Sequence, residues 1–341
     1  MKYKNFSDFE PNKPAKVGVL ITNLGTPAAP TKAELKKYLK QFLSDPRIVE
    51  APRLLWWLVL NGVILNFRPA RSAKAYQGVW TEQGSPLLVH TQAQQQKIAE
   101  KLNMDFGDKV VVEYAMRYGE PSVTATLDKL FEQGARQLLV LPLYPQYSAT
   151  TTASTFDAIA QDFTQRRLLP DFKFISHYHD NPAYIQALAD KVRAHWAQHG
   201  RADKLIFSYH GIPKRYVTNG DPYQAECYQT SALVADNLGL AENEFLTTFQ
   251  SRFGREEWLK PYTDQTLKAL PAKGVKSVQV ICPGFSADCI ETIEEIDEEN
   301  REYFIEAGGE TFEYIPALNA DAQHIEMLVG LIKDNLKAWI N

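Results

Sequence analysis

The chain of 341 residues repeats one pattern of apolar runs and turns twice along its length. Each half holds four runs rich in β-branched and other apolar residues, and helix-like segments separate the runs. Continuous runs of this kind predict strands that are buried on both faces of a parallel sheet. In the first half they are Val17–Leu24, Val110–Met116, Leu138–Leu143 and Phe172–His177, and in the second half they are Leu205–Ser208, Phe245–Phe249, Val278–Cys282 and Phe312–Ile315.

Short motifs recur in the same order after equivalent runs. T-N-L-G-T-P (22–27) corresponds to S-Y-H-G-I-P (208–213), and R-Y-G (117–119) corresponds to R-F-G (252–254). Strands that alternate with helices form parallel sheets, which bind ligands at the carboxyl ends of their strands. We therefore predict an α/β protein of two similar Rossmann-like domains, each with a four-stranded parallel sheet flanked by helices, and a cleft between them.

The boundary between the two domains is predicted near residue 178. The N-terminal domain is expected to span residues 1–178 and the C-terminal domain residues 179–316. Asn181-Pro182 is typical of a helix start, and Gly200 is typical of a helix end, so a long helix should open the second domain.

Composition excludes several classes of protein. With 45% hydrophobic residues, 23% charged residues and a net charge of -4, the chain is expected to be globular and not to bind nucleic acid. Its three cysteines include no C-x-x-C pair, which argues against a disulfide framework, a structural zinc site and an iron–sulfur cluster. The N-terminal residues lack the apolar core of a secretion signal, and no apolar run is long enough to span a bilayer. A cytoplasmic protein is expected.

Residues 54–67, L-L-W-W-L-V-L-N-G-V-I-L-N-F, form the most apolar stretch of the chain. A membrane-spanning helix needs about 20 apolar residues, so this stretch is too short to cross a bilayer. Two interpretations stay open. The stretch is either a helix buried in the core, or an apolar lip that contacts a hydrophobic ligand or the inner face of a membrane, where tryptophan is favourable.

His210 follows the predicted strand Leu205–Ser208, and Gly211 and Pro213 indicate a turn directly after it. The imidazole is therefore expected at the carboxyl edge of the second sheet, where parallel α/β proteins bind their ligands. Its unperturbed pKa of about 6.5 suits proton transfer or metal binding near neutral pH. A purely structural histidine is the alternative.

A helix predicted to begin near Asp288 has a row of glutamates on one face. Carboxylates at i,i+4 repel each other by a few tenths of a kcal/mol per pair, and no lysine interrupts the row. A cation would relieve this repulsion, and oxygen ligands suit the transit of a divalent metal or the removal of protons. A solvated acidic face is the alternative. The row is Glu291, Glu295, Glu298, Glu299 and Glu302.

Weaker candidates for substrate contacts lie at strand ends and turns. Arg117 and Tyr118 end a predicted strand, where an arginine also commonly packs between strand ends. Ser85 lies in the G-S-P turn (84–86) that follows Tyr76, and its hydroxyl and the turn amides could bind a carboxylate.

Taken together, these motifs resemble the ferrochelatase family, specifically its bacterial members. The resemblance runs nearly end to end and includes N-L-G-T-P (23–27), F-L-S-D-P-R-I-V (42–49), S-Y-H-G-I-P, T-F-Q-S-R-F-G-R-E-E-W-L-K-P (248–261) and C-P-G-F-S-A-D-C-I-E-T-I-E-E-I. It implies two Rossmann-like domains around a porphyrin cleft, with a C-terminal helix (317–341) packed back on the N-terminal domain. The implied activity is that of a lyase, the insertion of Fe²⁺ into protoporphyrin IX to form protoheme with release of two protons, the terminal step of heme biosynthesis.

The same resemblance assigns roles by position. His210 and Glu291 match the catalytic residues, and these two with Glu295 and Glu298 match the residues that handle the metal. Substrate contacts are implied for Arg117, Tyr118, Tyr76, Ser85, Trp56 and Asp288.

The chain departs from the family in two ways. Cys289 stands where many members have a histidine, and the C-terminal cysteines that bind a [2Fe–2S] cluster in some relatives are missing. The implied partners are protoporphyrin IX and Fe²⁺ as substrates, with no iron–sulfur cluster and no permanently bound cofactor. A monomer is expected, and peripheral membrane contact through residues 54–67 stays open.

Three other functions fit parts of the pattern. They are a ferrochelatase for coproporphyrin, a chelatase that inserts Co²⁺ or Ni²⁺ into a sirohydrochlorin-type ring, and a non-catalytic protein that closes on a solute. The apolar stretch favours a hydrophobic porphyrin with two propionates over a ring with eight carboxylates. A dinucleotide site is excluded because no G-x-G-x-x-G follows the first strand.

Overall fold

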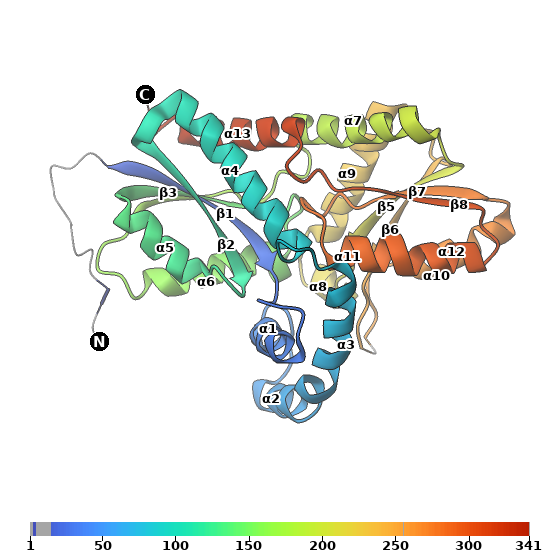
Figure 1. The fold of residues 1–341 in the computed structure, drawn as a ribbon, viewed down its shortest axis with the longest axis horizontal. Helices are drawn as coiled ribbons and strands as arrows, with labels where there is room; N and C mark the ends of the chain where they lie inside the picture. The colour runs from blue at the N-terminus through green and yellow to red at the C-terminus, as the bar shows by residue number, and fades with distance from the viewer. Residues whose placement is uncertain (1–2, 5–14, 255, 341) are drawn as a thin grey trace. The chain divides into compact units, whose positions relative to one another are not determined.

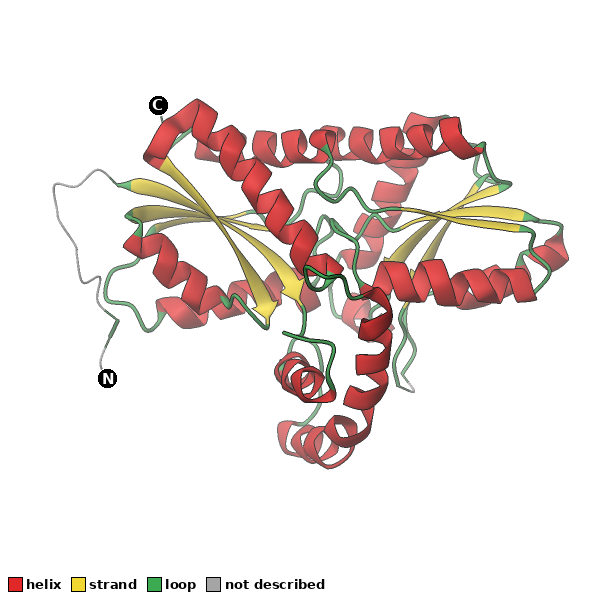
Figure 2. Ribbon diagram, viewed as in Figure 1, coloured by secondary structure: helices red, strands yellow, loops and turns green. Residues whose placement is uncertain are grey.

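The computed structural model describes residues 3–4, 15–254 and 256–340. Its internal contacts divide the chain into two compact units. Unit 1 comprises Met1–Leu143, Ala149–Ser176 and Ile325–Asn341, and unit 2 comprises Tyr144–Ser148 and His177–His324. Each unit is an α/β fold with helices around a parallel sheet, so the predicted fold class is confirmed (Figures 1 and 2).

The sheet of unit 1 has the strand order β2-β1-β3-β4, with all neighbours parallel. Its strands are β1 (Lys16–Gly25), β2 (Val110–Tyr118), β3 (Ala135–Pro142) and β4 (Asp171–Phe174). Strand β1 lies inside the sheet, and Val19, Leu20 and Ile21 are all fully buried although alternate side chains point to opposite faces. Burial on both faces explains why the sequence of this strand is continuously apolar.

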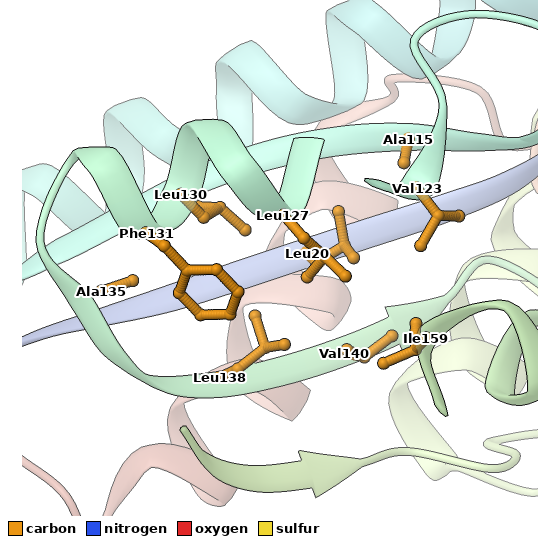
Figure 3. Close-up of a cluster of buried hydrophobic side chains, with 10 residues drawn as sticks. All are labelled: Leu20, Ala115, Val123, Leu127, Leu130, Phe131, Ala135, Leu138, Val140 and Ile159. Atoms are coloured by element: carbon orange, nitrogen blue, oxygen red, sulfur yellow. The ribbon is translucent and has the colours of Figure 1, made fainter. Parts of the chain in front are cut away.

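Helices cover both faces of this sheet. Figure 3 shows Leu127 and Leu130 of α5 facing Leu20 of β1 and Leu138 of β3, with Ile159 of α6 completing the cluster. Figure 1 shows α4 and α13 on the other side of the sheet. The helical elements here are α1 (Lys32–Ser44), α2 (Arg53–Val59), η1 (Leu60–Ile64), α3 (Leu65–Val79), α4 (Pro86–Phe106), η2 (Gly107–Lys109), α5 (Val123–Glu132), η3 (Ala149–Ala153), α6 (Ser154–Phe163) and α13 (Ala322–Leu336).

The sheet of unit 2 has the equivalent order β6-β5-β7-β8, again with all neighbours parallel. Buried apolar residues of α10, η5 and α12 pack against Ile206 and Val280 on one face. The elements of unit 2 are α7 (Pro182–His199), β5 (Lys204–His210), α8 (Lys214–Thr218), α9 (Tyr223–Leu238), β6 (Phe245–Gln250), α10 (Thr263–Ala269), η4 (Pro271–Lys273), β7 (Ser277–Ile281), α11 (Ile290–Thr292), η5 (Ile293–Asn300), α12 (Arg301–Glu306) and β8 (Thr311–Ile315).

All eight predicted strands are present, and the third and fourth differ most from their predicted bounds. The run Phe172–His177 was predicted as a strand, but β4 ends at Phe174. Ile175 still donates its N–H to Val140, and the chain then leaves the sheet because the Tyr178 N–H bonds to the Pro145 carbonyl. His177 thereby begins a segment of unit 2.

The end of the chain belongs to unit 1 by its contacts. Lys333 Nζ lies 2.5 Å from Asp105 of α4, and Lys173 Nζ donates to the carbonyl of Asn335 at 2.6 Å. Within the described residues, no helix is both long enough and apolar enough to pass through a membrane.

Candidate active site

His210 is the last residue of β5, and its conformation follows from the turn that Gly211 makes. The Gly211 N–H donates to the Gln250 carbonyl at 2.7 Å, and a Cβ on Gly211 would lie 2.9 Å from that oxygen. The imidazole Nδ1 lies 2.6 Å from the Gly211 carbonyl, which can only accept. Nδ1 therefore bears the proton, and the lone pair of Nε2 can accept a proton or bind a metal.

Gln250, the last residue of β6, joins the segments that carry His210 and Glu291. Its backbone pairs with His210 in the sheet, and its buried side chain donates to the Glu291 carbonyl at 2.8 Å and to Glu295 Oε2 at 3.4 Å. The Ser208 hydroxyl donates to Gln250 Oε1 at 2.7 Å, which fixes the orientation of the amide. One neutral side chain thus holds the end of the sheet against the start of the acidic helix.

The acidic helix is not the single α-helix that the sequence predicts. Only Ile290–Thr292 (α11) is α-helical at its start, and η5 (Ile293–Asn300) is a π-helix with i→i+5 hydrogen bonds. The wider turn shifts the register of the glutamate row. As a result, Glu295 and Glu299 line a common cavity, while the predicted metal residue Glu298 is exposed and is not among the residues that line it.

The cavity in unit 2 has a volume of about 220 Å³ and a polar lining. Arg252 donates two hydrogen bonds to the Asp264 carboxylate, at 2.5 and 2.9 Å, and the Tyr303 hydroxyl donates to Glu299 at 2.7 Å. The lining residues are Gln250, Ser251, Arg252, Thr263, Asp264, Glu295, Glu299, Asn300 and Tyr303. Sequence reasoning did not select Gln250, Ser251 or Asp264, although the first two lie in T-F-Q-S-R-F-G, directly after the strand next to that of His210.

Glu295 has the most perturbed carboxyl group of this cavity. Burial raises its pKa to about 7, and the nearby Glu291 carboxylate acts in the same direction, while hydrogen bonds from Ser251 and Gln250 oppose the rise. A carboxyl group with this pKa can both take up and release a proton near neutral pH. The hydrogen bond to Glu299 raises the pKa of Tyr303 to about 12, so the phenol keeps its proton.

Asp288, predicted to contact the substrate, is instead bonded inside the protein. Its buried carboxylate accepts hydrogen bonds from Tyr314 at 2.6 Å, Asn319 at 2.7 Å and Thr292 at 3.1 Å. These bonds occupy both oxygens. Asp288 therefore positions the start of the acidic helix relative to β8, and its contact with the substrate stays a prediction.

In unit 1, Arg117 and Tyr118 belong to a buried network. Arg117 Nη2 lies 2.5 Å from Asp45 Oδ2, and the Tyr118 hydroxyl donates to the same oxygen at 2.8 Å. Burial alone would raise the pKa of Asp45, but hydrogen bonds from Ser154, Arg47 and Tyr118 together with the charge of Arg117 lower it. Tyr118 is only 1% exposed, so its role in the free protein is to hold Asp45 and Arg117 in place.

Two other predicted substrate residues are also buried. The Ser85 hydroxyl caps α4 by accepting the Leu88 N–H at 3.3 Å, and it is 1% exposed. Tyr76 packs its ring against Trp80 at 6.1 Å between centroids.

The apolar stretch is largely exposed, so the interpretation as a buried core helix is wrong. Trp56 is partly buried and donates its indole N–H to the Leu43 carbonyl at 2.6 Å, whereas its neighbour Trp57 is 59% exposed. Leu60 and Leu65 point inward and hold the segment on unit 1. The side chains that are more than half exposed, called the apolar surface below, are Leu54, Leu55, Trp57, Leu58, Val63 and Phe67.

Known proteins share both the sequence and the fold. A family model described as Ferrochelatase matches residues 16–336. A ferrochelatase of Idiomarina loihiensis is 65% identical over 339 residues, covering 99% of this chain and 93% of that protein. A ferrochelatase of Marinobacter nauticus is 62% identical over 339 residues, covering 99% of this chain and 92% of that protein.

Solved structures with the same fold are much more distant in sequence. SirB from Bacillus subtilis with Fe³⁺ superposes with a TM-score of 0.55 at 10% identity and covers 96% of this chain and 99% of that one. CbiX, described as the terminal enzyme of siroheme biosynthesis in denitrifying bacteria, has a TM-score of 0.51 at 13% identity. The match covers 93% of this chain and 98% of that one. These two similarities show the fold alone. The family match and the near full-length identity above 60% show more: this chain belongs to the ferrochelatase family.

Proposed function

We propose that this chain inserts Fe²⁺ into protoporphyrin IX, which yields protoheme and two protons in the terminal step of heme biosynthesis. One observation supports it above the others: Gln250 connects the strand of His210 to the helix of Glu291 and Glu295. This arrangement holds a proton-accepting imidazole and a set of carboxylates on one framework, and family membership supplies the reaction.

The reaction removes two protons from the porphyrin, and two groups of this site can accept them. The porphyrin loses two pyrrole N–H protons as Fe²⁺ takes their place. His210 accepts at Nε2, because the Gly211 carbonyl keeps the other ring proton on Nδ1. Glu295, with a pKa of about 7, is the second group that can receive a proton and pass it to solvent through the cavity.

Fe²⁺ is the metal substrate, and it accepts mixed nitrogen and oxygen ligands. Glu299 and Glu295 line the cavity, and Glu291 precedes them on the helix. We assign these three carboxylates to the handling of the metal, with Glu291 and His210 in contact with the reacting centre. A flat macrocycle presents its nitrogen lone pairs poorly, so the protein is expected to bind the porphyrin bent toward the metal.

The roles of His210 and Glu291 are tested by His210→Ala and Glu291→Gln. Each variant should lower kcat at least about 100-fold, the loss typical of a missing proton-transfer group, while the Kd for protoporphyrin changes little. Glu306→Gln, which changes an exposed carboxylate on α12, is the control and should keep normal turnover. Near-normal kcat in both test variants would overturn the assignment. Comparison of kcat/KM for protoporphyrin, coproporphyrin and sirohydrochlorin separates the proposed substrate from its alternatives.

We also propose that the apolar surface contacts a membrane. Its side chains are each more than half exposed, and residues 51–81 include Arg53, Arg68, Arg71 and Lys74 but no acidic residue. Apolar side chains among basic ones favour the interface of a bilayer that contains anionic lipids.

A further inference from the structure

A second group of potential metal ligands lies in unit 2 and shares no residue with the acidic cavity. His177 and His179 lie in the segment between β4 and α7, and Glu226 lies in the first turn of α9. One ligand atom from each of the three side chains lies within 4.8 Å of the others. His177 Nδ1 is 2.8 Å from Glu226 Oε1, and His179 Nδ1 is 3.2 Å from Glu226 Oε2.

His179 contains an unsatisfied nitrogen that points at this carboxylate. Its Nε2 lies 3.0 Å from Oε1 of Gln229, which can only accept, so Nε2 bears the ring proton. Nδ1 then presents a lone pair to Glu226 Oε2, and it makes no hydrogen bond although the residue is only 5% exposed. Two electron-rich atoms at 3.2 Å in a buried place repel each other unless a positive charge lies between them.

The surrounding bonds hold the ligand atoms in place. The Tyr147 N–H donates to Glu226 Oε2 at 2.6 Å, and the Thr230 hydroxyl donates to the backbone carbonyl of His179 at 2.9 Å. Gln229 fixes the tautomer of His179, as outer-shell partners of metal ligands commonly do. The side chain of His177 is 50% exposed, so an ion could enter from solvent and keep a water ligand there.

We propose that His177, His179 and Glu226 bind a divalent transition-metal ion such as Zn²⁺ or Co²⁺. Two imidazoles and one carboxylate suit ions of borderline softness, and bond lengths of about 2.0–2.2 Å place neighbouring ligand atoms about 3.3–3.5 Å apart. The distance from His179 Nδ1 to Glu226 Oε2, 3.2 Å, is already close to this spacing. The distance from His177 Nδ1 to Glu226 Oε1, 2.8 Å, has to lengthen by about 0.6 Å, which the exposed side chain of His177 allows. The bound ion fastens the segment of His177 and His179 to α9.

The test must separate this group from other histidines that could bind Zn²⁺. His195, His199 and Glu313 form another such cluster, so all measurements use the full chain with His199→Ala, which removes one ligand of that cluster. Calorimetry measures Zn²⁺ binding to the His199→Ala protein, and to the same protein with His177→Ala or Glu226→Gln added. His210→Ala in the same background is the matched control for the acidic site.

The proposal predicts that His177→Ala and Glu226→Gln each weaken one Zn²⁺ site at least about tenfold, since loss of even an outer-shell partner costs about 10–100-fold. Zn²⁺ should also raise the Tm of the background protein more than that of either variant. The His210→Ala control should retain the site. Identical Zn²⁺ titrations in the background and in His177→Ala would overturn the proposal. His177 is half exposed, so that variant decides the question even if Glu226→Gln fails to fold.

Discussion

Glu295 shows how burial gives a single carboxyl group its chemistry. Burial raises its pKa to about 7, the nearby Glu291 adds to the rise, and the Ser251 hydroxyl limits it. In the unfolded chain a glutamate titrates near 4.5. Folding therefore takes up a proton at Glu295 between about pH 4.5 and 7, and the folded protein has a proton donor and acceptor near neutral pH.

This proton uptake makes stability depend on pH in a defined direction. Because the folded pKa lies above the unfolded value, the folded state binds more protons, and its stability falls as the pH rises from 4.5 through 7. Glu295→Gln removes the effect. Relative to the wild type, the variant should gain about 1–3 kcal/mol between pH 5 and pH 8, measured by urea denaturation at both values. Glu306→Gln should show no such gain, and an equal difference at both pH values would contradict the raised pKa.

Residues with charge or a ring nitrogen could be found from the sequence, while their neutral partners could not. His210 stands out because a strand, a glycine and a proline surround it. Gln250 makes the bonds that connect His210 to the acidic helix, yet an amide at a strand end has no distinctive pattern. Ser85 and Asp288 show why sequence alone does not assign a role, because a turn hydroxyl and an acid near a helix start fit substrate contact and capping equally well.

At the scale of elements, the π-helix decides which glutamates share the cavity. With α-helical spacing, Glu298 and Glu299 would both share a face with Glu291 and Glu295. The wider i→i+5 turns of η5 keep Glu299 on the cavity lining with Glu295 and leave Glu298 exposed. The larger number of residues per turn in a π-helix thus changes which glutamates face the cavity, although the sequence is the same.

The two neighbouring glutamates provide a matched test of this register. Glu299→Gln should raise the apparent KM for Fe²⁺ several-fold, because it removes a carboxylate from the cavity through which we expect the metal to pass. Glu298→Gln removes the same charge one residue away and should leave that KM nearly unchanged. Steady-state assays at saturating porphyrin measure both values. If Glu298→Gln had the larger effect, the metal would follow the α-helical face and not the cavity.

The inner strands β1 and β5 were predictable because nearly all of their residues are buried, which favours a mostly apolar run. The edge strand β4 has no fully buried residue, and its end was misplaced. The π-helix could not be predicted, because eight residues are too few for its hydrogen-bond pattern to produce a recognisable period in the sequence. The assignment of Tyr144–Ser148 to unit 2 also escaped prediction. It depends on contacts with residues about 80 positions away, such as the bond from Tyr147 to Glu226, which local patterns do not contain.

At the scale of the whole molecule, one framework occurs twice with different chemistry. His210 in unit 2 occupies the motif position that Leu24 has in unit 1. Arg252 pairs with Asp264 beside an open cavity, whereas its counterpart Arg117 pairs with Asp45 in a buried network. Unit 2 therefore supplies the titratable groups, and unit 1 supplies the apolar surface on α2, η1 and α3.

The basic charges around that surface make its membrane binding testable. Wild-type protein should sediment with vesicles that contain phosphatidylserine and bind more weakly to neutral vesicles, because Arg53, Arg71 and Lys74 are exposed near the apolar side chains. Trp57→Ser with Phe67→Ser removes two exposed rings from the surface. At about 1.5 kcal/mol each, their loss should weaken vesicle binding about 100-fold.

Met104→Ser is the matched control for this experiment, because Met104 is 83% exposed but lies on α4, outside the apolar surface. It should bind vesicles as the wild type does. Since all three changed side chains are exposed, none of the variants should lose more than a small part of its stability, which thermal unfolding checks. Equal vesicle binding by the double variant and the wild type would show that the exposed rings serve another contact. A concentration-dependent dimer of the wild type that the double variant cannot form would identify that contact as a second copy of the chain.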